Sequence, residues 1–117
     1  MLNGIDPALS ALRALGKKVE VTANNVANVD TDGFKKKRAI FQEGSPSGVT
    51  VSIEQVNTPG APLLSEAGRT GRCESSNVAV EEETVDLIAT GHAYTANVKL
   101  LKAEDEILGT LFDMLEK

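Results

Sequence analysis

The sequence predicts a mainly α-helical protein with a small β part, in which long N- and C-terminal helices pair as an antiparallel coiled coil. Apolar residues recur at alternating steps of three and four near both ends, as in helices that pack on other helices. Between them, one stretch alternates apolar and polar residues, as a half-buried strand does. We therefore expect an N-terminal axial helix in residues 1–29, a short β-hairpin or loop segment in 30–77 and a C-terminal axial helix in 78–117, together forming one structural domain.

The first helix should begin at Asp6 and Pro7, because aspartate can cap free N–H groups and proline suits the first helical position. We expect it to end at about Asn28. Gly16 lowers helix stability by about 1 kcal/mol relative to alanine, so either another segment approaches closely there or the glycine is simply tolerated. The predicted seam tapers from large residues to small ones and consists of Ile5, Leu9, Leu12, Gly16, Val19, Ala23 and Val26.

Three asparagines, Asn24, Asn25 and Asn28, lie near the end of this helix. Asparagine is a poor helix former because its amide competes for backbone hydrogen bonds. Asn24 and Asn28 share one helix face, with Asn25 beside them. The cluster could be a frayed helix end, or it could fix how the helix meets a partner, as buried asparagine does in coiled coils. We predict that it specifies helix pairing.

The turn from Asp30 to Gly33, together with Asn28, has the acidic spacing with which a calcium-binding EF-hand loop opens. That loop needs a bidentate glutamate at its twelfth position, which here is Ala39, and the basic run 35–38 stands in between. A turn is therefore predicted rather than a metal site. We interpret the basic run as a solvated strand edge or loop, because the chain as a whole is acidic.

The middle segment should contain a strand where apolar and polar residues alternate, from Val49 to Ile53. Residues 56–62 contain two prolines and predict a turn, after which Leu63–Leu64 would begin a short return strand. Residues 65–76 are polar and without periodicity, so we expect a loop that is mobile unless something binds it. Cys73 within it is interpreted as an incidental thiol.

The second helix should begin at about Ala79, with glutamates at 81–83 in its first turn, where the helix dipole favours negative charge. The lone histidine, His92, has no specific partner at metal-ligand spacing, so an exposed or interfacial helix position is expected. The predicted seam consists of Leu87, Gly91, Tyr94, Val98, Leu101, Asp105, Leu108, Phe112 and Leu115.

The two predicted helices differ in length. About 22 residues span about 33 Å, whereas about 37 residues span about 55 Å. In an antiparallel hairpin, roughly the last four turns of the second helix, from Leu101 to Leu115, would have no partner within the chain. An apolar seam without an internal partner indicates another subunit.

Composition excludes several classes of function. The net charge of -5 and the scarcity of aromatic residues argue against a nucleic-acid or anionic-membrane partner. No apolar run is long enough to span a bilayer, and the N-terminus lacks the pattern of a cleaved secretory signal. With one cysteine and one histidine, the chain offers no base–nucleophile pair, metal cluster or phosphate-cradling loop. We therefore expect no enzyme, cofactor or metal, and a cytosolic location by default.

Motifs at both ends of the chain resemble those of one family. Residues 23–35 resemble the signature of flagellar rod and hook proteins, in which an Ala-Asn-Asn-aliphatic-Ala-Asn run precedes a Thr-x-Gly-aromatic-Lys turn. Residues 76–78, 82–83, 93–97 and 105–108 resemble the family's C-terminal motif. The sequence departs from the family at Gly91-His92, where Gln-Arg is usual, and at Ala79, where aspartate is usual. The short middle segment resembles the proximal-rod type, although the turn 32–35 resembles the distal type equally.

The resemblance implies a structural subunit of the bacterial flagellar basal-body rod, which polymerises through its terminal helices into the axial drive shaft. Its partners would be copies of itself, other rod and hook proteins, and the flagellar export apparatus, which would carry it to the periplasm-spanning rod without a cleaved signal. Nucleic-acid binding and direct membrane insertion are not implied. The alternative is a small cytosolic coiled-coil adaptor that binds a partner helix with the same seam. We predict subunit or helix packing contacts at Leu9, Leu12, Val19, Asn24, Asn25, Asn28, Gly33, Phe34, Tyr94, Asn97, Leu101, Leu108, Phe112 and Leu115.

Overall fold

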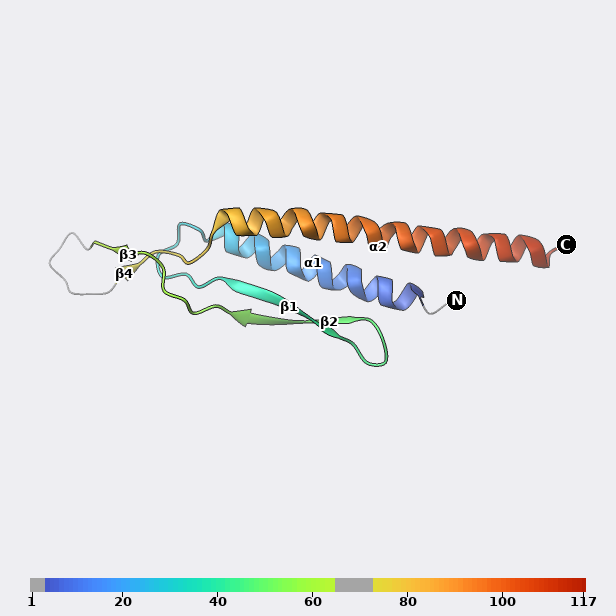
Figure 1. Cartoon of the computed structure of the whole chain (residues 1–117), viewed down its shortest axis with the longest axis horizontal. Coiled ribbons are helices and arrows are strands. Elements are labelled where there is room, and N and C mark those ends of the chain that lie inside the picture. The colour runs from blue at the N-terminus through green and yellow to red at the C-terminus, as the bar shows by residue number, and fades with distance from the viewer. Residues whose placement is uncertain (1–3, 65–72) are drawn as a thin grey trace.

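Two helices of unequal length dominate the computed structural model, which describes residues 4–64 and 73–117 (Figure 1). The helices run antiparallel in a molecule that measures 84 × 25 × 14 Å, and a small β part lies between them in the chain. The predicted mainly α-helical class with a β-hairpin is confirmed. The elements are α1 (Ile5–Ala27), β1 (Lys37–Glu43), β2 (Val49–Gln55), β3 (Pro62–Leu63), β4 (Cys73–Glu74) and α2 (Val80–Leu115).

The helix boundaries lie within two residues of the predicted ones, but one predicted cap is absent. Gly4 is the N-cap of α1 and makes no side-chain cap hydrogen bond, while Asp6 lies in the first turn, where its charge suits the helix dipole. The end of α1 is capped at Asn28: the Asn28 backbone N–H donates to the Asn25 carbonyl oxygen at 3.1 Å, and the Val29 N–H donates to the Val26 carbonyl oxygen at 3.2 Å. α2 follows its N-cap Ala79 directly, with the glutamates in its first turn as predicted.

The larger sheet is a hairpin that lies along α1. β1 pairs antiparallel with β2, from Lys37 opposite Gln55 to Glu43 opposite Val49. The hydroxyl of Ser10 on α1 accepts a hydrogen bond from the Val49 backbone N–H at 3.0 Å, which fixes the start of β2 on the helix. The predicted strand from Val49 is therefore confirmed.

A second, two-residue ladder pairs β3 with β4 in antiparallel fashion. The predicted return strand thus exists at Pro62–Leu63, whereas Leu64 lies beyond it and is 99% exposed. The predicted loop over 65–76 is wrong at Cys73–Glu74, which form β4 through backbone pairing that side-chain periodicity does not reveal. Residues 65–72 of that loop lie outside the described residues.

The contact between the helices uses a different stripe from the predicted apolar seams. On α2 the buried residues are the polar Glu83 and Thr90. The predicted seam residues Leu9, Val19 and Val26 on α1 are instead 38%, 39% and 41% exposed, because they lie roughly a third of a turn from the buried stripe. Ile5, Leu12 and Leu101 of the predicted seams are half-buried, so the seams lie at the edge of the contact within the chain and not at its centre. The buried residues of α1 are Ala8, Ala14, Leu15, Val21, Thr22 and Asn25.

α2 continues beyond the start of α1. The Glu104 carboxylate lies against Gly4, where an added Cβ would overlap it, so α1 begins level with Glu104. Further along α2, Phe112 and Leu115 are 64% and 80% exposed. The prediction of an unpaired C-terminal stretch is confirmed over the described residues, although it begins about one turn after Leu101. No helix among residues 4–64 and 73–117 is long and apolar enough to cross a membrane.

Candidate functional site

The end of α1, the start of β1 and the start of α2 meet at one buried amide. Asn25 is 1% exposed. Its Nδ2 donates to the Lys37 carbonyl oxygen at 2.8 Å and to Glu83 Oε1 at 3.1 Å, and its Oδ1 accepts from the Lys37 backbone N–H at 2.9 Å. The amide therefore bonds both backbone groups of Lys37, as a neighbouring strand would, and it also bonds Glu83 on α2. Asn25 fixes the positions of the hairpin and of α2 relative to α1.

A second asparagine ties the segment before α2 to the hairpin. Asn77 Oδ1 accepts from the Lys36 backbone N–H at 2.6 Å, and Nδ2 donates to the carbonyl oxygens of Val56 and Thr58 at 2.8 and 3.0 Å. Its own backbone N–H donates to the Phe34 carbonyl oxygen at 3.3 Å. Asn77 was absent from the predicted packing residues. Its place in the quoted C-terminal motif is the signal that could have identified it.

Two ion pairs flank this junction. Lys35 bonds Glu74, and Lys36 bonds Glu82 at 2.8 Å. In each pair the hydrogen bond from the lysine lowers the pKa of the carboxyl group below its ordinary value. For Glu74, burial opposes this lowering of the pKa, while the Gly60 backbone N–H reinforces it. Both carboxylates are therefore charged near neutral pH, and the pairs hold the chain segments on either side of the junction together.

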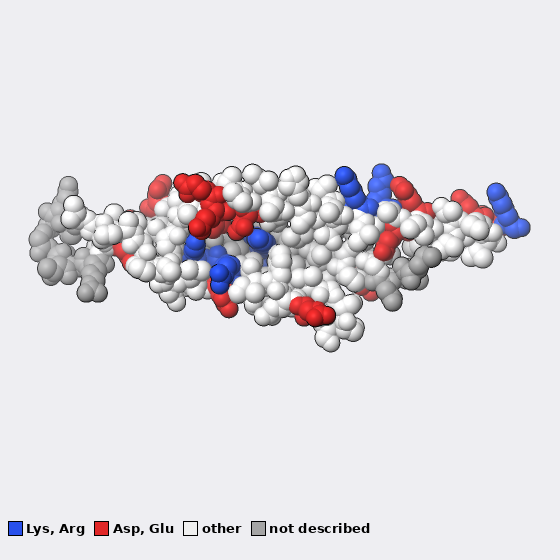
Figure 2. Space-filling model, viewed as in Figure 1, with Lys and Arg blue, Asp and Glu red and all other residues white. Residues whose placement is uncertain are grey.

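A cavity of about 440 Å³ lies between α1, the hairpin and the start of α2. Figure 2 shows acidic side chains beside basic ones at this place. Lys36 pairs with Glu82, and Lys18 approaches Asp86 at 3.8 Å, so the opposite charges largely neutralise one another. The cavity thus lacks the single sign of charge that would steer an ionic ligand. Its charged lining residues are Lys18, Lys36, Lys37, Arg38, Glu82, Glu83 and Asp86.

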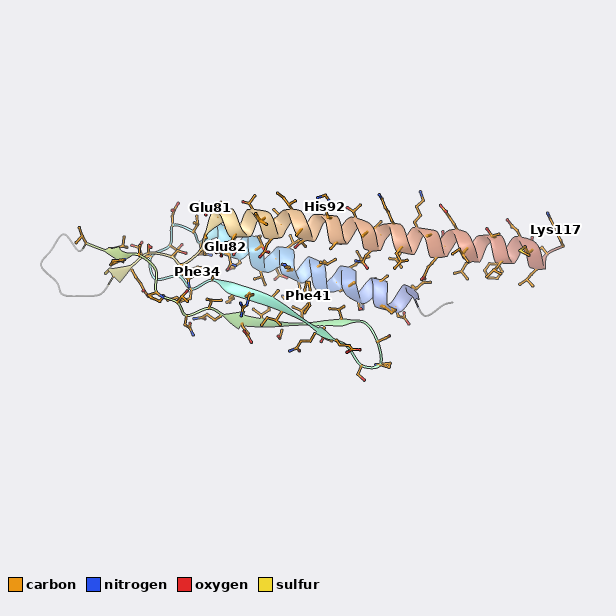
Figure 3. The ribbon with its side chains drawn as sticks, viewed as in Figure 1. Phe34, Phe41, Glu81, Glu82, His92 and Lys117 are labelled. Carbon is orange, nitrogen blue, oxygen red and sulfur yellow. The ribbon has the colours of Figure 1, made fainter. Side chains whose placement is uncertain are left out.

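Side chains considered for metal binding or catalysis lie in three separate elements. Asp30 and Asp32 are exposed in the turn after α1, and Cys73 is exposed on β4. His92 is exposed on α2 and points away from α1 (Figure 3). Within the described part of the chain, no group of three or more His, Cys, Asp or Glu side chains could hold a metal ion.

The predicted asparagine cluster divides into separate roles. Asn25 is buried at the junction, whereas Asn24 is exposed. Asn28 acts locally: its Nδ2 donates to the Asn24 carbonyl oxygen at 2.9 Å, and its Oδ1 accepts from the Thr31 hydroxyl at 3.1 Å. Asn28 therefore ends α1 and begins the turn. Whether Asn24 and Asn28 also contact other subunits stays a prediction.

Gly33 and Phe34 hold the turn against the segments that follow. Gly33 has a φ of 73°, in the left-handed region that favours glycine, and its N–H donates to the Glu74 carbonyl oxygen at 2.7 Å. Phe34 is half-buried, and its N–H donates to the Thr31 carbonyl oxygen at 3.1 Å. Both predicted residues thus contribute to the junction within the chain.

The two predicted seams lie on the face of the helix pair that the hairpin leaves uncovered. The hairpin contacts α1 through Ser10 and Asn25, and Leu12 lies nearly opposite Ser10 on the helix. On α2, Glu82 lines the cavity on the hairpin side, and Leu87 lies more than a third of a turn away. In an antiparallel pair these positions bring both seams to one face.

We name these two surfaces by their members. Leu87, Tyr94 and Val98 are 47%, 45% and 43% exposed, so the apolar surface is open along the paired part of α2. The α1 stripe consists of Ile5, Leu9, Leu12, Gly16, Val19, Ala23 and Val26, and the α2 stripe consists of Leu87, Gly91, Tyr94, Val98, Leu101, Asp105 and Phe112.

A polar row on α2 faces α1 and was missed by the apolar pattern. Glu83 and Thr90 are buried, and Asn97 and Glu104 are half-buried at the same spacing of seven residues. The Asn97 Nδ2 donates to the Ala93 carbonyl oxygen of its own helix at 2.9 Å. A heptad of polar residues is the signal that could have revealed this row. The predicted Leu108 and Leu115 lie near the line on which this row continues, half-buried and exposed respectively.

An antiparallel pair of terminal helices, with an apolar stripe uncovered on each helix and one helix longer than the other, defines a structural subunit that associates through helix packing. Comparison with known families agrees with this class. Residues 5–35 match the family described as flagella basal body rod protein, and residues 69–114 match the family described as flagellar basal body rod FlgEFG protein C-terminal.

Individual relatives extend these matches over most of the chain. The FlgC flagellar basal-body rod protein of Salmonella typhimurium is 31% identical over 86% of this chain and 87% of the relative. That of Yersinia enterocolitica is 32% identical over 92% of both chains. The FlgG rod protein of Bacillus subtilis is 30% identical over 80% of this chain but 38% of its own length. The chain therefore belongs to the flagellar basal-body rod protein family, and it is FlgC-like in its extent.

Proposed function

We propose that the chain polymerises through its terminal helices into the axial drive shaft of the flagellum and transmits torque by packing, without catalysis. Membership of the rod family makes it a structural component of the flagellar basal body that assembles with itself and with other rod and hook components. In this proposal residues 1–29 and 78–117 form the axial part, and 30–77 form a short middle segment. The observation that carries it is the continuation of α2 past α1 with Phe112 and Leu115 exposed.

We assign the contacts between subunits to the α1 and α2 stripes and to Leu108 and Leu115. Burying one such side chain contributes roughly 1.5–3 kcal/mol, so several together could stabilise association of helices that expose them in the single chain. A contact in which the end of one subunit meets a different surface of the next does not close, and it therefore generates a filament.

The test is concentration-dependent assembly of the purified chain, followed by sedimentation velocity and electron microscopy. Parental protein should grow into elongated particles as its concentration rises. Phe112→Glu should keep the parental thermal midpoint but lower the average mass at high concentration, because a charge at an interface costs desolvation. The matched control is Lys99→Glu, on the exposed outer face of α2, which should assemble as the parent does.

Two outcomes would contradict the proposal. If the parental chain stays monomeric at every concentration, it does not polymerise by itself. If Phe112→Glu melts as early as Leu15→Glu, which places a charge at a residue 6% exposed, then the end of α2 belongs to the fold of the single chain.

The route to the rod is a separate proposal. We infer that the flagellar export apparatus carries the chain outward without removing an N-terminal signal, as the family resemblance implies. Intact-mass spectrometry of the chain recovered from rods checks this directly. A mass that lacks N-terminal residues would contradict it.

A further inference from the structure

Three glycines lie within the helices at positions where an added Cβ would meet nothing within 4 Å, and two of them, Gly16 and Gly91, lie where α1 and α2 run alongside each other. Gly16 lies within α1 and Gly91 within α2, where glycine is less favourable than alanine. A Cβ added at either position would meet nothing within 4 Å. At Gly60, by contrast, an added Cβ would overlap the backbone carbonyl of Ser75, so the chain itself requires glycine there.

Gly16 and Gly91 lie at the same level along the helix pair. Asn25 bonds Glu83 near one end of the helix pair, and Gly4 lies against Glu104 at the other end. This antiparallel register places Gly16 level with the turn of α2 that contains Gly91. Gly16 belongs to the α1 stripe and Gly91 to the α2 stripe, so both face the uncovered side. We call this pair the glycine notch, because each glycine interrupts the side chains of its own stripe at the same level.

The C-terminal end of α2 carries the side chains that suit such a surface. Beyond Glu104, the helix exposes Phe112 (64%) and Leu115 (80%), and Leu108 lies one turn before Phe112. Leu108 and Leu115 are seven residues apart, the same spacing as Leu12 and Val19 beside the notch. α2 is one uninterrupted helix, so its end cannot fold back to its own notch. An occupant from the same sequence must come from another copy.

We propose that the glycine notch receives Phe112 from a second copy, whose C-terminal end of α2 lies between the α1 stripe and the α2 stripe. The absence of a Cβ at Gly16 and Gly91 lets the incoming helix approach closely and leaves room for the aromatic ring. Each copy then donates its end to one neighbour and receives the end of another, which is a head-to-tail contact. This inference rests on the proposed function and names the contact that builds the assembly.

The first experiment fills the notch. Gly91→Leu should keep or raise the thermal midpoint of the isolated chain, because leucine is a better helix former than glycine and the space is open. It should nevertheless weaken self-association at least tenfold in sedimentation equilibrium. The matched control is His92→Leu, one residue away on the outer face (Figure 3), which should associate as the parent does. Equal association of Gly91→Leu and His92→Leu would overturn the proposal.

The second experiment identifies the occupant by disulfide cross-linking. In a Cys73→Ser background, Gly16→Cys is placed on one copy and Phe112→Cys on another that carries a mass tag. The two are mixed under assembly conditions and oxidised. We expect the mixed disulfide, which identifies the notch and the helix end as partners. Lys99→Cys on the outer face of α2 replaces Gly16→Cys as the control and should give little product.

The remaining outcomes separate this proposal from the proposed function. Disulfides only between two Phe112→Cys copies would indicate end-to-end pairing of α2 and would overturn the notch contact. In a further outcome, filaments form while Gly16→Cys gives no more disulfide with Phe112→Cys than the Lys99→Cys control does. That result would overturn the notch contact but leave polymerisation intact. If no association occurs at any concentration, both the notch contact and polymerisation by the chain alone are wrong.

Discussion

Replacing Asn25 by alanine should destabilise the folded chain by about 3–5 kcal/mol. The substitution leaves the Glu83 carboxylate without its partner at a buried site, and it leaves the Lys37 N–H and carbonyl without theirs at a partly buried one. Each unsatisfied buried group costs about 1–3 kcal/mol, and a charged group costs more. The estimate lies below the simple maximum because the surroundings relax. At about 4 °C per kcal/mol for a chain of this length, the thermal midpoint should fall by about 12–20 °C.

The assay is thermal and urea unfolding followed by circular dichroism at low protein concentration, where association does not add stability. Asn24→Ala is the matched control, because Asn24 is the same residue type, one position earlier and exposed. It should change the free energy of unfolding by no more than about 0.5 kcal/mol. Asn25→Asp should be at least as damaging as Asn25→Ala, since it sets a second carboxylate against Glu83.

A small effect would refute this account of the junction. If Asn25→Ala loses less than about 1 kcal/mol, water or a rearranged side chain satisfies Lys37 and Glu83 equally well. If Asn25→Asp is also tolerated, the amide is not what positions the hairpin and α2. If both variants are tolerated, the packing of the small residues around position 25 would instead position the hairpin and α2.

Three further predictions concern pH, glycine and calcium. The hydrogen bond from Lys35 lowers the pKa of Glu74 in the folded chain below 4.5, its ordinary value. The ion pair therefore adds its full stability above pH 4.5, and this stability is lost as the pH falls through the pKa of Glu74 in the folded chain. The urea midpoint should therefore drop with acidification, and less steeply in Lys35→Met. Gly60→Ala should lower the free energy of unfolding by about 1–3 kcal/mol, because the added Cβ overlaps backbone atoms. Gly16→Ala should raise the free energy of unfolding by up to about 1 kcal/mol. A change of the same sign in both variants would contradict the geometry. Millimolar calcium should leave the thermal midpoint unchanged, since an ion that does not bind cannot shift stability, and a rise of several degrees would contradict the interpretation of the turn after α1.

The elements with a strong local signal could be predicted from the sequence. Both helices show long apolar repeats, and the strand that begins at Val49 alternates over several residues. The unequal helix lengths followed from these repeats, and with them the unpaired end of α2. The ladder between Leu63 and Cys73 could not be predicted, because two-residue strands have no measurable period and are defined by backbone partners far apart in the chain.

The assignment of the seams failed for a different physical reason. Pattern reasoning places the largest apolar side chains inside, and so it selected Leu9 and Val19 for the contact within the chain. The buried positions of α1 are instead held by residues such as Ala14 and Thr22, and those of α2 by Glu83 and Thr90. A sequence shows which residues avoid water, but it does not show whether the surface that covers them belongs to the same chain.

The distribution of polar and apolar residues between these two surfaces is consistent with assembly. Apolar contacts are strong but weakly directional, so they tolerate several registers. An amide such as Asn25, which must satisfy Lys37 and Glu83 together, accepts only one register. A chain that uses the amide to set its own helix pair can leave its apolar stripes open for neighbours without losing its internal alignment. Exchanging the two, with leucine at position 25 and polar residues in the stripes, would produce a subunit that slips internally and has nothing with which to bind the next copy.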